Sequence, residues 1–136
     1  MSTTSIKEDC VLQAMKVIAD KGLEGLSLRA VARELGVSHQ APYKHFASRD
    51  HLLAEVIRRC LREFADVLTQ SGIAQDGSPL APEDAMQRLG IAYLKYAAEN
   101  PLAYRLMFAT PWPDAARELD LDVDARAAFD ILARRL

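Results

Sequence analysis

The stretch "SLRAVARELGVSHQAPYKHF" (Ser27–Phe46) decides the fold of this chain. Ser27 suits a helix N-cap, and apolar residues then recur at helical spacing until Gly36, a residue that favours a left-handed helix end. Only Val37 and Ser38 separate this helix from a second segment that is polar and aromatic. Two short helices joined by so few residues, with glycine in the connection, are typical of a helix-turn-helix.

Pro42 lies in the middle of the second segment, where a proline normally removes a hydrogen bond and clashes with the preceding turn. If Ser38 caps the segment, Pro42 falls at about the fourth helical position, where at most one early hydrogen bond is lost. The sequence therefore predicts a short α-helix from about His39 to Phe46, with Ser38 as its cap.

The leading residues of this predicted helix suit contact with base edges in a DNA major groove. Gln40 can pair bidentately with adenine, His39 can donate to or accept from a base edge, and Ala41 can touch a thymine methyl group. The residues behind them are phosphate-type donors that would fix register, namely Tyr43, Lys44 and His45. A solvated polar face is the ordinary alternative for any exposed helix, but the two capped helices around this segment favour DNA binding.

The remainder of the sequence predicts an all-α protein. Ser5 begins a capping box for a first helix that Gly22 closes, and Ser48 caps a long helix that reaches about Gln70. A polar Gly/Pro-rich linker follows at residues 71–82. We expect a three-helix DNA-binding domain at residues 1–50, a helical ligand-binding and dimerisation domain at residues 51–136, and a helix over residues 49–70 that connects them.

The distribution of charged and apolar residues restricts the kinds of partner that the protein can have. The net charge is −2, yet residues 1–60 carry nine Lys/Arg against seven Asp/Glu, while residues 61–136 carry eight against twelve. Only the N-terminal part therefore suits a polyanionic partner. No apolar run approaches the roughly 20 residues that span a bilayer, and the N-terminus lacks the apolar stretch of a signal peptide. We expect a cytoplasmic protein with no membrane partner and with buried thiols at Cys10 and Cys60.

The sequence predicts neither an enzyme nor a metal or cofactor site. It contains no Ser/His/Asp set, phosphate loop or HExxH motif. The run "DLDVD" (Asp120–Asp124) lacks the glycine and glutamate that a calcium loop needs at its sixth and twelfth positions. Those carboxylates are better explained as negative charge at a helix start.

Aromatic and sulfur-containing side chains follow the linker at helical spacing. They fit an apolar small-molecule pocket with a few orienting hydroxyl groups, and they also fit an ordinary core. The candidate ligand-binding residues are Met86, Tyr93, Tyr96, Tyr104, Met107, Phe108 and Trp112.

The segment "LSLRAVARELGVSHQAPYKHFASRDHLLAEV" (Leu26–Val56) closely resembles the DNA-binding signature of the tetracycline-repressor (TetR) family of bacterial transcription regulators. The resemblance implies a homodimer that binds palindromic double-stranded DNA and releases it when a small molecule, here apolar or aromatic, enters the second domain. It also implies DNA-binding roles for ten residues. Those implied to contact phosphates are Ser27, Arg29, Ser38, Tyr43, His45 and Arg49, and those implied to face bases are His39, Gln40, Ala41 and Lys44.

The segment "YLKYAAENPLAYRLMF" (Tyr93–Phe108) resembles the start of the ligand domain in a TetR subgroup whose later helix carries a Trp-His-Gly motif. The chain stops at Leu136, before the expected place of that motif, so we expect a truncated chain. The function expected overall is a ligand-responsive transcriptional repressor. The alternative is a helical protein–protein interaction module that does not bind DNA.

Overall fold

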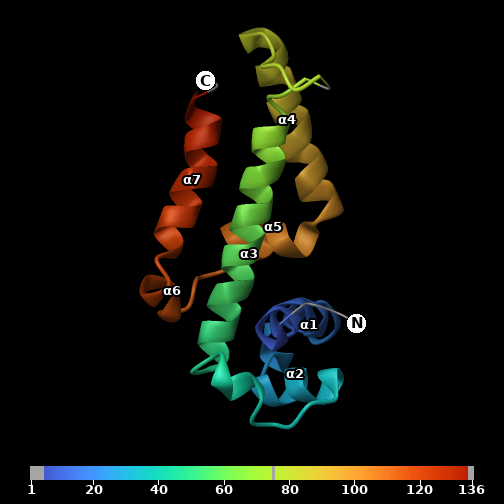
Figure 1. The fold of residues 1–136 in the computed structure, drawn as a ribbon, viewed down its shortest axis with the longest axis vertical. Helices are drawn as coiled ribbons and strands as arrows, with labels where there is room; N and C mark the ends of the chain where they lie inside the picture. The colour runs from blue at the N-terminus through green and yellow to red at the C-terminus, as the bar shows by residue number, and fades with distance from the viewer. Residues whose placement is uncertain (1–4, 75, 135–136) are drawn as a thin grey trace. The chain divides into compact units, whose positions relative to one another are not determined.

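The computed structural model describes residues 5–74 and 76–134, and in that part of the chain it confirms the all-α prediction (Figure 1). An isolated antiparallel bridge between Ile73 and Pro79 is the β-type pairing recorded in the linker. None of the helices in the described ranges is long and apolar enough to cross a membrane. The elements, in chain order, are α1 (Ile6–Lys21), η1 (Leu23–Gly25), α2 (Leu28–Leu35), η2 (Pro42–Lys44), α3 (Arg49–Gln70), α4 (Pro82–Glu99), α5 (Pro101–Phe108), α6 (Ala115–Glu118) and α7 (Leu121–Arg134).

The chain divides into two compact units, and α3, the long green helix of Figure 1, contributes to both. The first unit comprises the chain up to Val56 together with Trp112–Leu119. The second comprises Ile57–Pro111 and the chain from Asp120 onward. The predicted last residue of the final helix, Leu136, lies outside the described residues.

Hydroxyl caps start the helices of the first unit as the sequence predicts. Ser5 Oγ accepts from the amide of Glu8 at 3.1 Å, and Ser27 Oγ accepts from the amide of Ala30 at 2.9 Å. At α3, Ser48 Oγ accepts from the amide nitrogen of His51 at 3.3 Å. These bonds satisfy amides that have no partner inside the helix, and they fix where each helix begins.

The predicted α-helix over His39–Phe46 is wrong. The chain forms turns over residues 39–41 and then the 3₁₀-helix η2, whose N-cap is Ala41 rather than Ser38. An α-helix capped at Ser38 would need residue 42 to donate to the Ser38 carbonyl, and Pro42 has no N–H. The amide of Ala41 donates to that carbonyl instead, at 3.1 Å, and the tighter winding continues through His45, which donates to the Pro42 carbonyl at 3.0 Å.

Aromatic rings form the centre of the second unit. Phe64 on α3 is 1% exposed, and its ring centroid lies 5.6 Å from that of Tyr93, 5.1 Å from that of Tyr96 and 5.7 Å from that of Phe108. Arg62 Nε on α3 lies 3.0 Å from the carboxylate of Asp124, which attaches the start of α7. Asp124 thus has an ion-pair role, which accords with its expected place near a helix start.

Both cysteines are buried, as the sequence predicts. Burial raises the pKa of the Cys60 thiol to about 12, and the carboxylate of Glu63 adds to the shift. The thiolate is the reactive form of cysteine, and a raised pKa confines it to strongly alkaline solution.

We therefore expect Cys60 in the folded chain to react with iodoacetamide at pH 8 at least about a hundredfold more slowly than in the urea-unfolded chain, because both access and thiolate content are reduced. Mass spectrometry of timed samples measures the two rates. Similar rates in the folded and unfolded chain would contradict the burial described here.

Candidate nucleic-acid interface

The turn that contains η2 presents its polar side chains outward because its apolar residues point inward. Pro42 and Phe46 are buried, and Phe46 is 2% exposed. Ala41 is half-buried beside them. The residues between and around these anchors are exposed, namely Ser38, His39, Gln40, Tyr43, Lys44 and His45. The turn therefore exposes hydrogen-bonding and cationic groups to solvent and rests on two buried apolar residues.

The start of α2 adds two further donors. Ser27 is half-buried and its oxygen caps the helix, which leaves the hydroxyl hydrogen available to donate. Arg29 stands exposed in the first turn of α2. From Ser27 to Arg49 the sequence contains four Lys/Arg and one glutamate, so this segment is more basic than the chain as a whole.

Arg49 has a different setting from the other candidate DNA contacts. Its Nε donates to the Leu26 carbonyl at 3.0 Å and one terminal nitrogen donates to the Leu23 carbonyl at 2.7 Å. The other terminal nitrogen pairs with Asp50 at 3.0 Å. The guanidinium thus joins the start of α3 to η1, the connector before α2. This arrangement makes Arg49 a positioning residue for the whole motif.

A hydrogen-bonded chain that the sequence analysis missed reaches from the start of α3 to α6. His51 Nδ1 lies 2.8 Å from Ser48 Oγ, and His51 Nε2 lies 2.6 Å from a carboxylate oxygen of Glu118. The Ser48 oxygen already caps α3, so the chain is a structural link rather than a nucleophile with its base. His51 and Glu118 are 67 residues apart, so no local sequence pattern predicts their contact.

The seven candidate ligand-binding residues have several different settings. Tyr93 and Tyr104 share a hydrogen bond of 3.0 Å between their hydroxyl groups, which raises the pKa of Tyr93 to about 12. With Tyr96 and Phe108 they take part in the ring cluster around Phe64. Met107 is buried and Met86 is half-buried, while Trp112 is assigned to the first unit.

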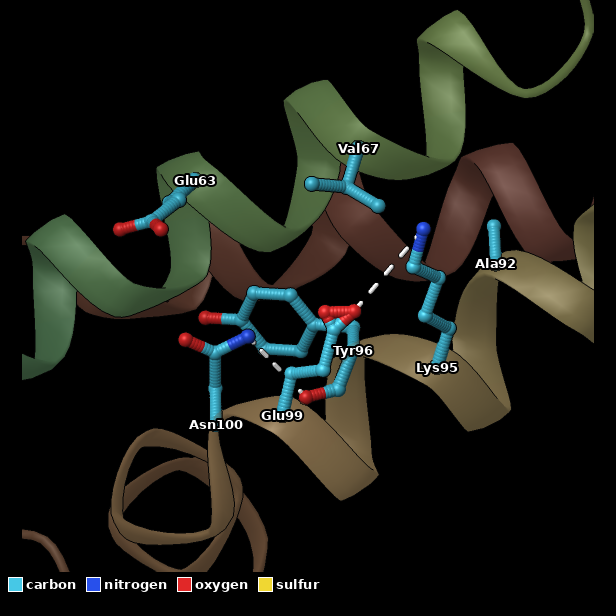
Figure 2. Close-up of a pocket in the computed structure, with 7 residues that line it drawn as sticks. All are labelled: Glu63, Val67, Ala92, Lys95, Tyr96, Glu99 and Asn100. Carbon is cyan, nitrogen blue, oxygen red and sulfur yellow. Dashed lines mark hydrogen bonds and ion pairs between the residues drawn. The ribbon is translucent and has the colours of Figure 1, made fainter.

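Of these seven, Tyr96 does line a groove between α3 and α4, of about 350 Å³ (Figure 2). The other lining residues were not singled out from the sequence, because most are charged or small residues on helix faces that look solvated. They are Glu63, Val67, Ala92, Lys95, Glu99 and Asn100. Within the described part of the chain, no three His, Cys, Asp or Glu side chains gather in a way that could hold a metal ion.

Comparison with known proteins relates the first part of the chain to a family of regulators. A family model described as "Bacterial regulatory proteins, tetR family" matches residues 11–56. The HTH-type transcriptional regulator Rv1816 of Mycobacterium tuberculosis is 31% identical over 96 residues, which is 71% of this chain and 40% of that relative. The uncharacterised HTH-type transcriptional regulator YobS of Bacillus subtilis is 29% identical over 100 residues, or 73% of this chain and 50% of that relative.

Solved structures share the fold over nearly the whole chain. A protein of unknown function from Rhodococcus sp. RHA1 superposes with a TM-score of 0.77 at 26% identity, over 97% of this chain and 66% of that one. A proposed TetR-family transcriptional regulator from Vibrio parahaemolyticus gives a TM-score of 0.73 at 22% identity, over 96% of this chain and 68% of that one.

The matched residues coincide with the geometry described above. They include α2, the turn with η2 and the first part of α3, and therefore every residue of the exposed polar surface and of the Arg49 contacts. The relatives from M. tuberculosis and B. subtilis are longer than the matched region, since this chain spans half of their length or less. Residues 11–56 of this chain are therefore similar to the N-terminal domain of TetR-family regulators.

Proposed function

We propose that this chain is a DNA-binding transcriptional regulator. The observation that carries the proposal is the exposed polar surface at residues 38–45, built on the buried Pro42 and Phe46 inside the segment that is similar to a TetR-family N-terminal domain. An isolated polar surface would be unremarkable, but this one lies where a helix-turn-helix meets the major groove. The names of the relatives, which are HTH-type transcriptional regulators, support the same function.

Within this proposal the exposed residues divide into two roles. His39 and Gln40, with the small Ala41 beside them, face base edges, and Lys44 has the reach to join them. Phosphates are contacted by hydroxyl and cationic groups around this centre, which fix the register of the protein on the duplex. These are Ser27, Arg29, Ser38, Tyr43 and His45. Arg49 acts through the position of the motif, since its guanidinium already holds two carbonyl groups.

We further propose a cytoplasmic, ligand-responsive repressor that acts as a homodimer on a palindromic operator, of the subgroup with the Trp-His-Gly motif. Two recognition surfaces about 34–36 Å apart would meet successive major grooves. A ligand that prefers another conformer of the dimer would shift the population away from that spacing. Large apolar side chains that are more than half exposed support association with another surface: Ile91 and Leu94 on α4, and Val123 on α7.

The same exposed apolar side chains favour the second candidate function, a helical protein–protein interaction module. Leu94 is 69% exposed and Val123 is 66% exposed, and a contiguous patch of such side chains would suit a protein partner. The two functions differ in their dependence on salt. Binding to duplex DNA releases counterions and weakens steeply as salt rises, with a slope near −0.9 per neutralised phosphate, whereas binding through apolar surfaces does not.

We expect the chain to bind duplex DNA from the region upstream of its gene, and the affinity to fall about linearly on a log–log plot between 50 and 200 mM salt. Fluorescence anisotropy with a labelled duplex measures this. Absence of affinity at low salt would contradict the regulator proposal and leave the interaction module.

Two substitutions test the division of roles on the exposed surface. Tyr43→Ala removes a phosphate contact and should weaken binding about equally on all duplex variants. Gln40→Ala removes a base contact and should relax discrimination at one base pair by about 1–3 kcal/mol. The measurement is a panel of duplexes that differ at single positions, and the division of roles fails if both substitutions give the same profile.

Arg49→Lys and Tyr43→Phe form a pair that separates positioning from contact. Lysine cannot reproduce the fork that holds the Leu23 and Leu26 carbonyls, so Arg49→Lys should lower the free energy of unfolding by about 1–3 kcal/mol and weaken DNA binding with it. Tyr43 is 53% exposed, so Tyr43→Phe should weaken DNA binding with a change in stability of at most about 0.5 kcal/mol. Urea unfolding followed by circular dichroism gives the stabilities, and an unchanged stability for Arg49→Lys would contradict the positioning role.

A further inference from the structure

The groove between α3 and α4 is lined at one end by hydrogen-bond acceptors. Figure 2 shows Glu63 of α3 and Asn100, which follows α4, on one side of the groove, with Glu99 between them and Lys95. The two glutamates supply carboxylate oxygens, which accept and do not donate when ionised. Both side chains belong to the second unit, so the groove is formed within that unit alone.

Asn100 adds a third acceptor because its amide has a fixed orientation. Its Nδ2 donates to the backbone carbonyl of Tyr96 at 3.2 Å. That bond directs the nitrogen away from Glu63 and leaves Oδ1 on the side of the groove that carries the carboxylate (Figure 2). A free asparagine amide can either donate to a ligand or accept from it. Because the Nδ2 of Asn100 is already engaged, its Oδ1 can only accept from a ligand.

The buried hydroxyl of Tyr96 is the independent sign of a ligand. Tyr96 is 4% exposed, and its oxygen has no hydrogen-bond partner among the residues that the structure describes. Buried tyrosine hydroxyls normally have a hydrogen-bond partner, because a buried polar group without a hydrogen bond is unfavourable. Figure 2 shows this hydroxyl beside the Asn100 side chain, at the Glu63 end of the groove. Burial raises the pKa of Tyr96, and the neighbouring Cys60 and Glu63 add to the shift, so the group remains a neutral hydroxyl.

The rest of the groove is apolar or cationic. Val67 and Ala92 form the wall between the two ends. Lys95 stands at the far side, with its Nζ 3.9 Å from the Glu99 carboxylate and a side chain that is 73% exposed. A shallower depression beyond it is lined by Arg88, Lys95 and Ile91, among others. Lys95 and Glu99 thus form an ion pair on one side of the groove, while Glu63, Asn100 and the buried Tyr96 hydroxyl lie at the other end.

We propose that this groove binds an organic ammonium ion with an apolar body. The ammonium group has donors and no acceptor, which matches a site made of two carboxylates, an amide oxygen and a tyrosine hydroxyl. Its apolar body lies along Val67 and Ala92. The inference deepens the proposed function, on which it rests for one point: that the bound ion is the effector of the regulator.

The test compares three probes of equal length, hexylammonium, 1-hexanol and hexanoate, at one ionic strength. Each is titrated into the whole ¹⁵N-labelled chain, and amide shifts are followed. Hexylammonium should cause saturable shifts at Glu63, Val67, Tyr96 and Asn100, with a Kd at least about tenfold below that of 1-hexanol, since a charge-assisted hydrogen bond exceeds a neutral one by about that factor. Hexanoate should bind more weakly still at these residues.

Matched variants connect the binding to the acceptor set. E63Q/E99Q keeps the size of both side chains and should raise the Kd for hexylammonium at least about tenfold while leaving that for 1-hexanol unchanged. Asp130→Asn removes an exposed carboxylate of α7 outside the groove and should leave both values unchanged. Tyr96→Phe should weaken hexylammonium binding without abolishing it.

Two outcomes would overturn the inference. One is equal or tighter binding of 1-hexanol or hexanoate at these residues. The other is shifts with hexylammonium that do not saturate and that Asp130→Asn reduces as much as E63Q/E99Q does, which is the behaviour of a diffuse acidic surface. DNA affinity of the same preparation is measured without any probe. If the chain binds DNA but not hexylammonium, only the ammonium site is contradicted. If the chain does not bind DNA, the proposed function is contradicted.

Discussion

Pro42 has no amide hydrogen, and the shape of the exposed polar surface follows from that. The Ser38 carbonyl takes its hydrogen bond from Ala41 instead of from residue 42, so the segment winds tightly and ends within a few residues. The ring of Pro42 is itself buried, and with Phe46 it anchors the turn to the apolar core of the first unit. A short, tightly wound turn with two inward anchors leaves its remaining side chains facing solvent. The hydrogen-bonding groups of His39, Gln40 and Tyr43 are thereby collected on one exposed surface.

This surface can bind a partner only if its position relative to the neighbouring helices is fixed. Two sets of polar contacts fix that position. The Arg49 guanidinium ties the start of α3 to the carbonyls of Leu23, which begins η1, and Leu26, which follows η1. The Ser48–His51–Glu118 chain ties the same helix start to α6. Residues 112–119 are assigned to the first unit, while the chain on either side of them belongs to the second. The chain thus passes from the second unit into the segment with α6 and then returns to the second unit.

The extent of prediction from sequence depended on the range of the interactions involved. The caps at Ser5, Ser27 and Ser48 were predictable because each acts over three residues, and Gly22 and Gly36 ended their helices for equally local reasons. The sequence indicates that Pro42 is decisive, but the predicted α-helix allows only for the loss of one early hydrogen bond. The structure shows that this bond was the one needed to start an α-helix, so a 3₁₀ turn forms in its place.

Contacts between residues far apart in the chain could not be predicted from the sequence. Nothing in the pattern links His51 with Glu118, or the Arg49 side chain with the Leu23 carbonyl. Tyr93, Tyr96, Tyr104 and Phe108 lie on helices, whereas Trp112 lies between α5 and α6. Several of these rings pack around Phe64, and the groove is lined by Glu63, Glu99 and Asn100 with Tyr96. Charged side chains on a helix face look solvated in a sequence, and only the packing of α4 beside α3 brings them to one groove.

We propose that the exposed surface around η2 is the face that meets DNA. Amide spectra of the whole ¹⁵N-labelled chain, recorded as a duplex from upstream of its gene is added, test this most directly. If this surface meets DNA, the largest shifts are expected at residues 38–41 and 43–45 and around Arg29, with little change along α4. Shifts concentrated at Ile91 and Leu94, with the residues around η2 unaffected, would contradict it.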